Sequence, residues 1–206
     1  MTTAASVDHV LVVGAGLAGL RTVAELRAAG YTGRLELIGA EVHPPYDRPP
    51  LSKELLSKPG PVWLAEDLGH DLTELADEVH LGVRAASLRS STDGVQVTSA
   101  GGRTFSADQV VLATGSHALR PPEWTGVVTL HTLDEAEQLR SALAERGEVI
   151  VIGAGWIGAE VAGVAAGAGS RVQVLESGPV PLWRQLGEEL GQRTVPWYAE
   201  AGVSLH

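Results

Sequence analysis

The sequence predicts an α/β fold in which one strand–turn–helix–strand unit occurs twice, with a small antiparallel β layer inserted between the copies. Three observations support this prediction. The pattern G-x-G-x-x-G follows a short apolar run at residues 10–13 and again at residues 149–152. Each glycine motif leads into helical apolar periodicity, a second β-rich run and an acidic residue at or just beyond its end. Between the copies, short alternating segments are separated by glycine-containing turns, as in antiparallel hairpins.

The first unit begins with Val10–Val13, an apolar run that predicts a strand buried on both faces. It continues with the glycine motif Gly14-Ala15-Gly16-Leu17-Ala18-Gly19. In such a motif the first glycine permits a tight turn, the second lets the backbone approach a pyrophosphate, and the third lets the helix pack against the strand. A predicted helix and a strand at residues 34–38 follow, and Glu41 could accept hydrogen bonds from a ribose 2′-OH. The order of these parts predicts a dinucleotide site of the Rossmann type.

A proline-rich loop at residues 43–50 follows the first unit. Prolines fix φ and hold the segment extended, and Ser52 is then predicted to cap a short helix. The pattern leaves two interpretations open. The loop is a rigid connector, or it is a stiff support that presents Arg48 and Lys53 to a ligand.

The middle of the chain is predicted to alternate between short elements. A helix is predicted at residues 71–78 and a strand at residues 79–81, before antiparallel strands between residues 83 and 105. A buried strand is predicted at residues 109–113, ending in Thr114-Gly115-Ser116. A glycine at the carboxyl end of a central strand indicates a ligand contact, because ligands of doubly wound sheets lie at that edge.

The second unit repeats the first 139 residues further along, from Gly14 to Gly153. It follows a linker and an amphipathic helix predicted at residues 134–146. A buried strand predicted at residues 149–152 leads into Gly153-Ala154-Gly155-Trp156-Ile157-Gly158. Each copy has five parts in the same order: a strand, the glycine motif, a helix, a second strand and an acidic residue. Two such copies are far less expected by chance than one. The chain is therefore predicted to hold two dinucleotides, most simply a flavin dinucleotide and a nicotinamide dinucleotide.

The second strand of this unit, residues 171–175, ends at Glu176. An acid at that position accepts the 2′-OH of NAD and repels the 2′-phosphate of NADP, so the sequence favours NAD. The alternative is a solvated charge at the end of a strand.

Composition excludes several classes of protein. The chain has 206 residues and a net charge of −10, which argues against nucleic acid or an anionic membrane surface as a partner. It has no cysteine, which excludes a disulfide framework, a thiolate metal site and a cysteine nucleophile. The seven histidines show no H-x-x-H spacing, so no metal is predicted. The sequence contains neither an apolar run of ~20 residues nor an export signal, and we expect a cytoplasmic protein without a membrane span.

With these motifs, the chain resembles the FAD-dependent NADH:ferredoxin reductases that serve Rieske-type oxygenases and bacterial cytochromes P450, within the pyridine nucleotide-disulfide reductase superfamily. The Tyr-Asp-Arg-Pro-Pro-Leu-Ser-Lys run is the specific feature, since glycine motifs alone fit many flavoproteins. The resemblance covers nearly the whole chain. The matching segments are residues 14–19, 37–39, 45–53, 111–116 and 151–160.

The resemblance implies a first part of an FAD-binding domain at residues 1–120 and a truncated NAD-binding domain at residues 121–206. The cofactor-binding residues predicted for FAD are Gly14, Gly16, Leu17, Ala18, Gly19, Ala40, Glu41, Arg48, Lys53, Ala86, Ala113, Thr114, Gly115 and His131. Those predicted for NADH are Gly153, Gly155, Trp156, Ile157, Gly158, Glu160, Glu176 and Arg184, the last near the adenosine half.

Specific roles follow from the same resemblance. Arg48 and Lys53 would lie near the pyrophosphate and the isoalloxazine, and Ala86 would meet the adenine through its backbone. Glu160 would contact the nicotinamide end, and Trp156 would stand by the face of the flavin. No side chain is predicted to act as a catalytic acid or base, because the flavin performs the redox chemistry.

Three departures from the family pattern are visible. The family commonly has an acid where this chain has Ala40, so Glu41 would have to substitute. The family has an arginine where this chain has His131, and a neutral imidazole holds phosphate less well than a guanidinium. The family also continues for about as many residues again. We therefore expect either a fragment or a natural truncation at His206, with a complementing chain fragment as a possible partner.

The main hypothesis is a flavoprotein oxidoreductase that takes hydride from NADH onto FAD and passes single electrons to a ferredoxin or a similar iron–sulfur protein. The lack of cysteine rules out relatives that relay electrons through an active-site disulfide. Two alternatives stay open. One is a truncated, non-catalytic nucleotide-binding remnant, and the other is a different flavoprotein of the superfamily, such as a nitrite reductase subunit.

Overall fold

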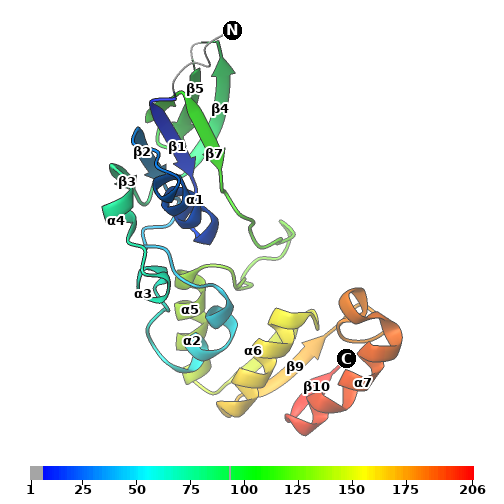
Figure 1. Ribbon diagram of the computed structural model, residues 1–206. Helices are drawn as coiled ribbons and strands as arrows, with labels where there is room; N and C mark the ends of the chain where they lie inside the picture. The colour runs from blue at the N-terminus through cyan, green and yellow to red at the C-terminus, as the bar shows by residue number, and fades with distance from the viewer. Residues whose placement is uncertain (1–6, 93) are drawn as a thin grey trace. The chain divides into compact units, whose positions relative to one another are not determined.

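The computed structural model describes residues 7–92 and 94–206, which divide into two compact units. The first unit comprises the described residues up to Asp47 together with Val62–His117. The second comprises Arg48–Pro61 together with Ala118–His206. The segment Arg48–Pro61 precedes half of the first unit in the chain, yet it packs with the second. Figure 1 labels most of the helices and strands.

A four-stranded parallel sheet forms the centre of the first unit, in the order β3-β2-β1-β7. Its strands were all predicted from the sequence, and their bounds are β1 His9–Val13, β2 Arg34–Ile38, β3 Glu78–His80 and β7 Gln109–Leu112. Helix α1, Leu17–Ala28, connects β1 to β2 as predicted. The α/β class of the fold is thereby confirmed.

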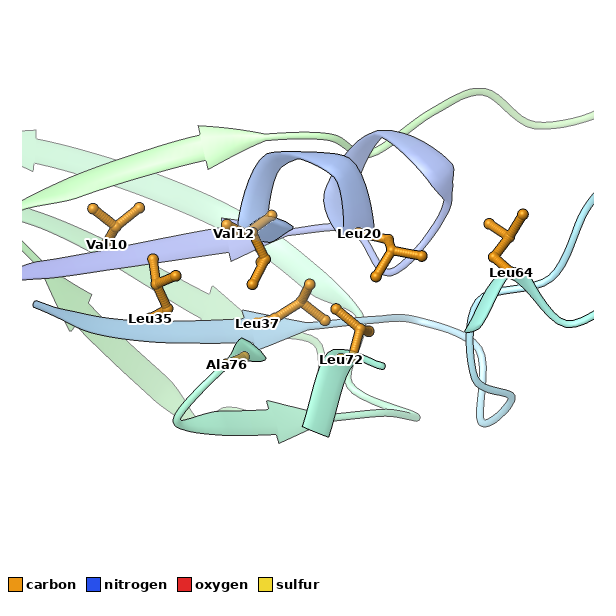
Figure 2. Packing of buried hydrophobic residues seen from close by; sticks show 9 residues of the cluster. Val10, Val12, Leu20, Leu35, Leu37, Leu64, Leu72 and Ala76 are labelled. Carbon is orange, nitrogen blue, oxygen red and sulfur yellow. The ribbon is translucent and has the colours of Figure 1, made fainter. Parts of the chain in front are cut away.

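Each face of this sheet packs against a different layer. On one face, Val10, Val12, Leu35 and Leu37 pack with Leu20 of α1, and Figure 2 shows these side chains directed into one cluster. On the other face, apolar residues of β1 and β2 pack with residues of a second sheet. This second cluster consists of Leu11, Val13, Ile38, Val97, Phe105 and Ala107.

The second sheet is the predicted antiparallel layer. Its three strands are β4 Ala85–Ser91, β5 Gly94–Ser99 and β6 Thr104–Ala107, in the order β4-β5-β6. The pairing of β4 with β5 shifts register between Ala85 and Ser87, which marks a β-bulge at Ala86.

Short helices differ from the predictions in three places. The segment after the proline-rich loop forms a 3₁₀ helix η1, Pro49–Ser52, and helix α2, Glu54–Ser57. The N-cap of α2 is Lys53, so the prediction that Ser52 caps this helix was wrong. The helix predicted at residues 71–78 is only α4, Leu72–Leu75, because the backbone is already extended at Ala76. Helix α3, Leu64–Leu68, was not predicted.

The second unit contains a three-stranded parallel sheet in the order β10-β9-β8. Its elements are α5 Leu133–Ala144, β8 Glu148–Ile152, α6 Trp156–Gly167, β9 Arg171–Leu175, α7 Trp183–Glu200 and β10 Val203–Leu205. The predicted helix before the repeat and the predicted strand–helix–strand order are both confirmed by these bounds. Helix α2 packs against α5 and α6, which is why its segment belongs to this unit.

Strand β8 is less buried than predicted. Among the described strands it pairs only with β9, and Ile150 and Ile152 are 61% and 50% exposed. The predicted burial of β7 was also wrong at its end, since Leu112 is 64% exposed at the edge of its own sheet. A strand buried on both faces needs covering layers, and the apolar run predicted the strand but not the layers around it.

Helix α7 is the longest helix of the described residues and is interrupted at Gly187, where φ is 76° and ψ is 171°. A left-handed φ of this kind is readily adopted only by glycine. Within residues 7–92 and 94–206, none of the helices has the length and hydropathy that crossing a membrane requires.

Candidate dinucleotide-binding sites

The first glycine turn has the steric form expected for a dinucleotide site. The N–H of Gly14 donates to the carbonyl of Ile38 at 2.8 Å, and its φ is +123°. A Cβ at Gly19 would lie 1.8 Å from the carbonyl oxygen of Gly14, so only glycine allows α1 to pack this close to the turn. A Cβ at Gly16 would meet no atom within 4 Å. The space beside Gly16 is therefore open to a ligand.

The start of α1 presents hydrogen-bond donors beside this open space. Gly16 is the N-cap residue and offers no side-chain acceptor, and the first turn carries no acidic residue. The first N–H groups of a helix lack partners within the helix, and together with the helix dipole they favour an anion. Leu17 and Ala18, both predicted at the site, are exposed in this first turn.

The predicted segment Ala113–Gly115 lies against the same turn. A Cβ at Gly14 would lie 2.0 Å from the carbonyl oxygen of Ala113 and 3.2 Å from the nitrogen of Thr114. Gly115 adopts a left-handed φ of 68°. The ends of β1 and β7 thus bring two separately predicted segments into direct contact.

The end of β2 supplies the acid. Glu41 accepts a hydrogen bond from the hydroxyl of Tyr46, while Ala40 is exposed. A Cβ at Gly39 would lie 2.5 Å from the Cβ of Ala15, so this glycine lets the end of β2 approach the glycine turn. Gly39 and Tyr46 were not predicted as site residues, although both lie within the segments that carry the family resemblance.

Ala86 is placed so that its backbone is available. It is exposed and lies at the bulge, between the paired residues Ala85 and Ser87, outside the register of β4 and β5. Bulges leave the extra residue unpaired, and this freedom is what a backbone contact to a base requires.

The second glycine turn reproduces the first. The N–H of Gly153 donates to the carbonyl of Leu175 at 2.7 Å, and a Cβ at Gly158 would lie 2.1 Å from the carbonyl oxygen of Gly153. A Cβ at Gly155 would again meet no atom within 4 Å. The repeat seen in the sequence is therefore a repeat of the same hydrogen bonds and close contacts.

Glu176 holds the second glycine turn through hydrogen bonds to its backbone. Its two carboxylate oxygens accept backbone N–H groups of Ala154 and Gly178, at 2.6 and 2.7 Å. The indole of Trp183 covers Gly178, since a Cβ at Gly178 would lie 2.1 Å from Nε1 of Trp183. The guanidinium of Arg184 lies 5.3 Å from the centre of the Trp183 ring. Glu176 and Arg184 were predicted separately, and Trp183, which links them, was missed.

A groove of about 750 Å³ opens beside the second turn. It is lined by the linker residues 118–130, by β8 and by the glycine motif, including Gly153, Gly155, Gly158 and the exposed side chains of Trp156 and Ile157. Five of the residues predicted for the nicotinamide dinucleotide therefore share one cavity.

Lys53 and Glu160 form an ion pair within the second unit. The distance from Lys53 Nζ to Glu160 Oε2 is 3.1 Å, and Lys53 Nζ also donates to the carbonyl of Pro49 at 3.0 Å. The hydroxyl of Ser52 donates to the same carboxylate oxygen of Glu160. The segment of the proline-rich motif is thereby joined to α6, and Ser52, which the sequence suggested only as a cap, contacts the predicted site residue Glu160.

Arg48 binds the linker before α5 through a backbone carbonyl. Its Nη1 donates to the backbone carbonyl of His131. The backbone N–H groups of His131 and Thr132 donate to Glu135 at 2.7 and 3.0 Å, and Thr132 in turn accepts from the N–H of Glu135, which completes a capping box. Burial opposes ionisation of Glu135, but hydrogen bonds from Thr129, Thr132 and His131 outweigh it and lower its pKa.

The sequence as a whole matches a known family. A sequence model of the pyridine nucleotide-disulphide oxidoreductase family matches residues 8–206. The chain belongs to this family. Its fold, with parallel sheets and helices around two glycine turns, is the one expected for FAD/NAD-binding members of the family.

Three similar proteins illustrate the relationship. The ferredoxin–NAD(+) reductase subunit of the benzene 1,2-dioxygenase system of Pseudomonas putida is 39% identical over 96% of this chain and 49% of its own length. The ferredoxin reductase component of the chlorobenzene dioxygenase of Cupriavidus sp. (strain PS12) is also 39% identical, over 96% of this chain and 48% of its own length. The crystal structure of the ferredoxin reductase for the CYP199A2 system from Rhodopseudomonas palustris is 35% identical, with a TM-score of 0.83 over 97% of this chain and 50% of that one. The chain spans about half the length of the curated relatives it matches.

Proposed function

We propose that this chain binds FAD through the first unit and NADH through the second, as part of an oxidoreductase that delivers electrons to a ferredoxin or a similar iron–sulfur protein. The observation that carries the proposal is the pair of glycine turns, which share the same hydrogen bonds and close contacts. The relatives named above, described as ferredoxin reductases of dioxygenase systems, support this choice of reaction and partner.

The first unit has features that suit FAD. Gly16 leaves open space where a pyrophosphate would approach, and the unpaired donors of α1 would bind its oxygens. Glu41 would accept hydrogen bonds from the ribose, with its carboxylate oriented by Tyr46. The bulge at Ala86 would offer its backbone to the adenine.

The second unit has features that suit NADH. Gly155 leaves the corresponding open space, and Trp156 and Ile157 line the adjoining groove. A carboxylate has about four lone-pair positions, so Glu176 keeps acceptor capacity for a ribose hydroxyl after binding two backbone N–H groups. Its charge would repel the 2′-phosphate of NADPH.

The protein's share in the reaction is binding and orientation. The chemistry supplied by bound FAD is acceptance of a hydride from NADH and release of electrons one at a time to a one-electron acceptor. Lys53 would provide a positive charge that favours an anionic reduced cofactor, and Glu160 holds that lysine in place. No side-chain proton donor is assigned, in keeping with the sequence prediction.

A matched pair of substitutions tests the assignment of the two cofactors. Gly16→Val and Gly155→Val each fill the open space at one turn, and neither new side chain meets a protein atom at its Cβ. We expect Gly16→Val to abolish FAD binding and to leave NADH binding intact, with Gly155→Val doing the reverse. Binding is measured by flavin and nicotinamide fluorescence. Loss of both ligands in either variant, or of neither, would contradict the proposal.

A separate assay tests the electron acceptor. NADH-dependent reduction of the ferredoxin of an aromatic-ring dioxygenase system and of a dye is followed in protein loaded with FAD. We expect turnover with both acceptors, whereas dye reduction without ferredoxin reduction would reject the proposed partner. Nucleotide binding without any turnover would favour a non-catalytic nucleotide-binding protein.

We propose the cytoplasm as the compartment, because NADH is produced and consumed inside the cell. Fractionation of the producing cells, with a cytoplasmic dehydrogenase as the reference, tests this. Recovery of the protein outside the cytoplasmic fraction would reject the assignment.

A further inference from the structure

Two histidines and two glutamates converge on one face of the parallel sheet in the first unit. Leu11 is the register partner of Glu36, and Glu36 is the partner of Glu78. His9 lies two residues before Leu11, and His80 lies two residues after Glu78, so all four side chains project from the same face. These four residues, His9, Glu36, Glu78 and His80, are called the His–Glu cluster below.

The ligand-type atoms of the His–Glu cluster lie close together. His80 Nε2 is 2.9 Å from Glu36 Oε1 and 3.3 Å from Glu78 Oε2. His9 Nε2 is 3.2 Å from Glu36 Oε2. An ion held at ~2.0–2.2 Å by tetrahedral nitrogen and oxygen ligands keeps those ligand atoms roughly 3.3–3.5 Å apart. These three pairs already have nearly this spacing, and the ligand atoms of Glu36, Glu78 and His80 all lie within 4.8 Å of one another.

Two features indicate that an ion would be stabilising. Glu36 is only 4% exposed, and a buried carboxylate is costly unless its charge is compensated. His9 Nε2 is shielded from solvent and makes no hydrogen bond among the described residues, although it faces a carboxylate oxygen. When Nε2 carries the lone pair of the imidazole, that lone pair is repelled by the carboxylate unless a cation lies between them.

Two arginines contact the cluster and would compete with an ion. Arg34 Nη2 lies 2.6 Å from Glu78 Oε1 and 3.5 Å from Glu36 Oε2. Arg103 lies over the ring of Phe105 and approaches both ring nitrogens of His80, at 3.3 and 3.5 Å. The side chain of Arg34 is 46% exposed, so it can withdraw into solvent, and the bound ion would then replace its charge beside Glu36.

We propose that the His–Glu cluster binds one divalent transition-metal ion, with Zn²⁺ as the best match to two imidazoles and two carboxylates. The ion would join β1, β2 and β3 and would stabilise the first unit. Entry is from solvent beside Glu78, whose side chain is 44% exposed on the edge strand β3. The sequence predicted no metal because the four ligands come from three strands and have no characteristic spacing along the chain.

Calorimetric titration of ZnCl₂ into the untagged, EDTA-treated chain tests this proposal. We expect one ion per chain and a rise in the thermal unfolding temperature. Co²⁺ in place of Zn²⁺ should give the intense visible absorption of tetrahedral coordination. Glu78→Gln and His80→Gln should each weaken Zn²⁺ binding by about tenfold or more, since even partners outside the ligand set cost 10–100-fold.

His117→Gln is the matched control, because His117 is an exposed histidine outside the cluster. It should bind Zn²⁺ as the unaltered chain does. Absence of saturable binding by the unaltered chain would overturn the proposal, as would equal affinity in Glu78→Gln and His80→Gln. Circular dichroism establishes that each variant is folded. Because Glu78 is exposed, Glu78→Gln should disturb folding less than His80→Gln.

Discussion

The ammonium group of Lys53 lies 3.1 Å from the carboxylate of Glu160, which joins the proline-rich motif to the second turn of α6. Ser52 donates to the same carboxylate, so one acid fixes two residues of that motif. The family resemblance implies that Lys53 lies near the isoalloxazine, where this pair would control how much positive charge the cofactor experiences. The pair therefore allows opposite changes of charge to be tested on the two partners.

We expect Lys53→Ala to lower the reduction potential of FAD-loaded protein, and Glu160→Gln to raise it. A unit charge 4 Å from a developing anion contributes ~4 kcal/mol at an effective dielectric constant near 20, and about 1.4 kcal/mol corresponds to 30 mV for a two-electron couple. The shifts should thus be on the order of tens of millivolts in spectroelectrochemical titrations. Equal potentials in both variants and the unaltered protein would remove Lys53 from this role.

Glu176 should determine the preference for NADH over NADPH. We expect Glu176→Gln to reduce the ratio of NADH to NADPH affinity by about tenfold, or 1.4 kcal/mol, because repulsion of the 2′-phosphate is lost. The ratio is the decisive quantity, since the amide also disturbs the backbone contacts to Ala154 and Gly178. Glu188→Gln changes the net charge equally at an exposed site and should leave the ratio unchanged.

The bulge at Ala86 provides a backbone test. Ala86→Pro removes an N–H that lies outside the pairing of β4 with β5, so the strands keep their ladder. Loss of one hydrogen bond of about 0.5–1.5 kcal/mol should weaken FAD binding roughly two- to tenfold. Ala86→Gly retains the N–H and serves as the control. Unchanged affinity in the proline variant, measured by flavin fluorescence, would argue against contact through this N–H.

The capping box of α5 should make stability depend on pH. The pKa of Glu135 is lowered in the folded state, so its contribution is complete above the unfolded value of about 4.3 and is lost as pH falls through the folded pKa. Glu135→Ala should cost about 0.5–2 kcal/mol at neutral pH, the usual range for a lost cap. In unfolding experiments, the difference from the unaltered chain should shrink below about pH 4. A pH-independent difference would show that packing, and not charge, is responsible.

The exposed edge of β8 should promote self-association. Unpaired strand edges with apolar side chains are templates for pairing with another chain, and a charge at the edge prevents it. We expect Ile150→Lys to reduce the association seen by light scattering, while Leu190→Lys, at an equally apolar exposed position on α7, should not. Similar scattering from the two variants would mean that general hydrophobicity, rather than the strand edge, drives association.

Local chemistry explains which features could be predicted. The positions of Gly14 and Gly153 followed from the sequence because a glycine turn is determined by its own residues and their immediate strand. The burial of β8 did not follow, because exposure of Ile150 depends on which strands and layers lie beside it. Ser52 was mistaken for a cap because its actual partner, Glu160, is 108 residues away. The His–Glu cluster was invisible for the same reason, since β-sheet register alone brings His9 to Glu36.

The assignment of Arg48–Pro61 to the second unit has a consequence for biosynthesis. The chain passes between the units after Asp47, Pro61 and His117. Since translation proceeds from the N-terminus, α2 leaves the ribosome long before α5 and α6, the helices against which it packs. The side chains of Leu55 and Leu56 are buried in the folded unit. They therefore lack their packing partners until about 80 to 100 further residues have been translated. The nascent chain thus carries an apolar segment without its packing partners while these further residues are translated.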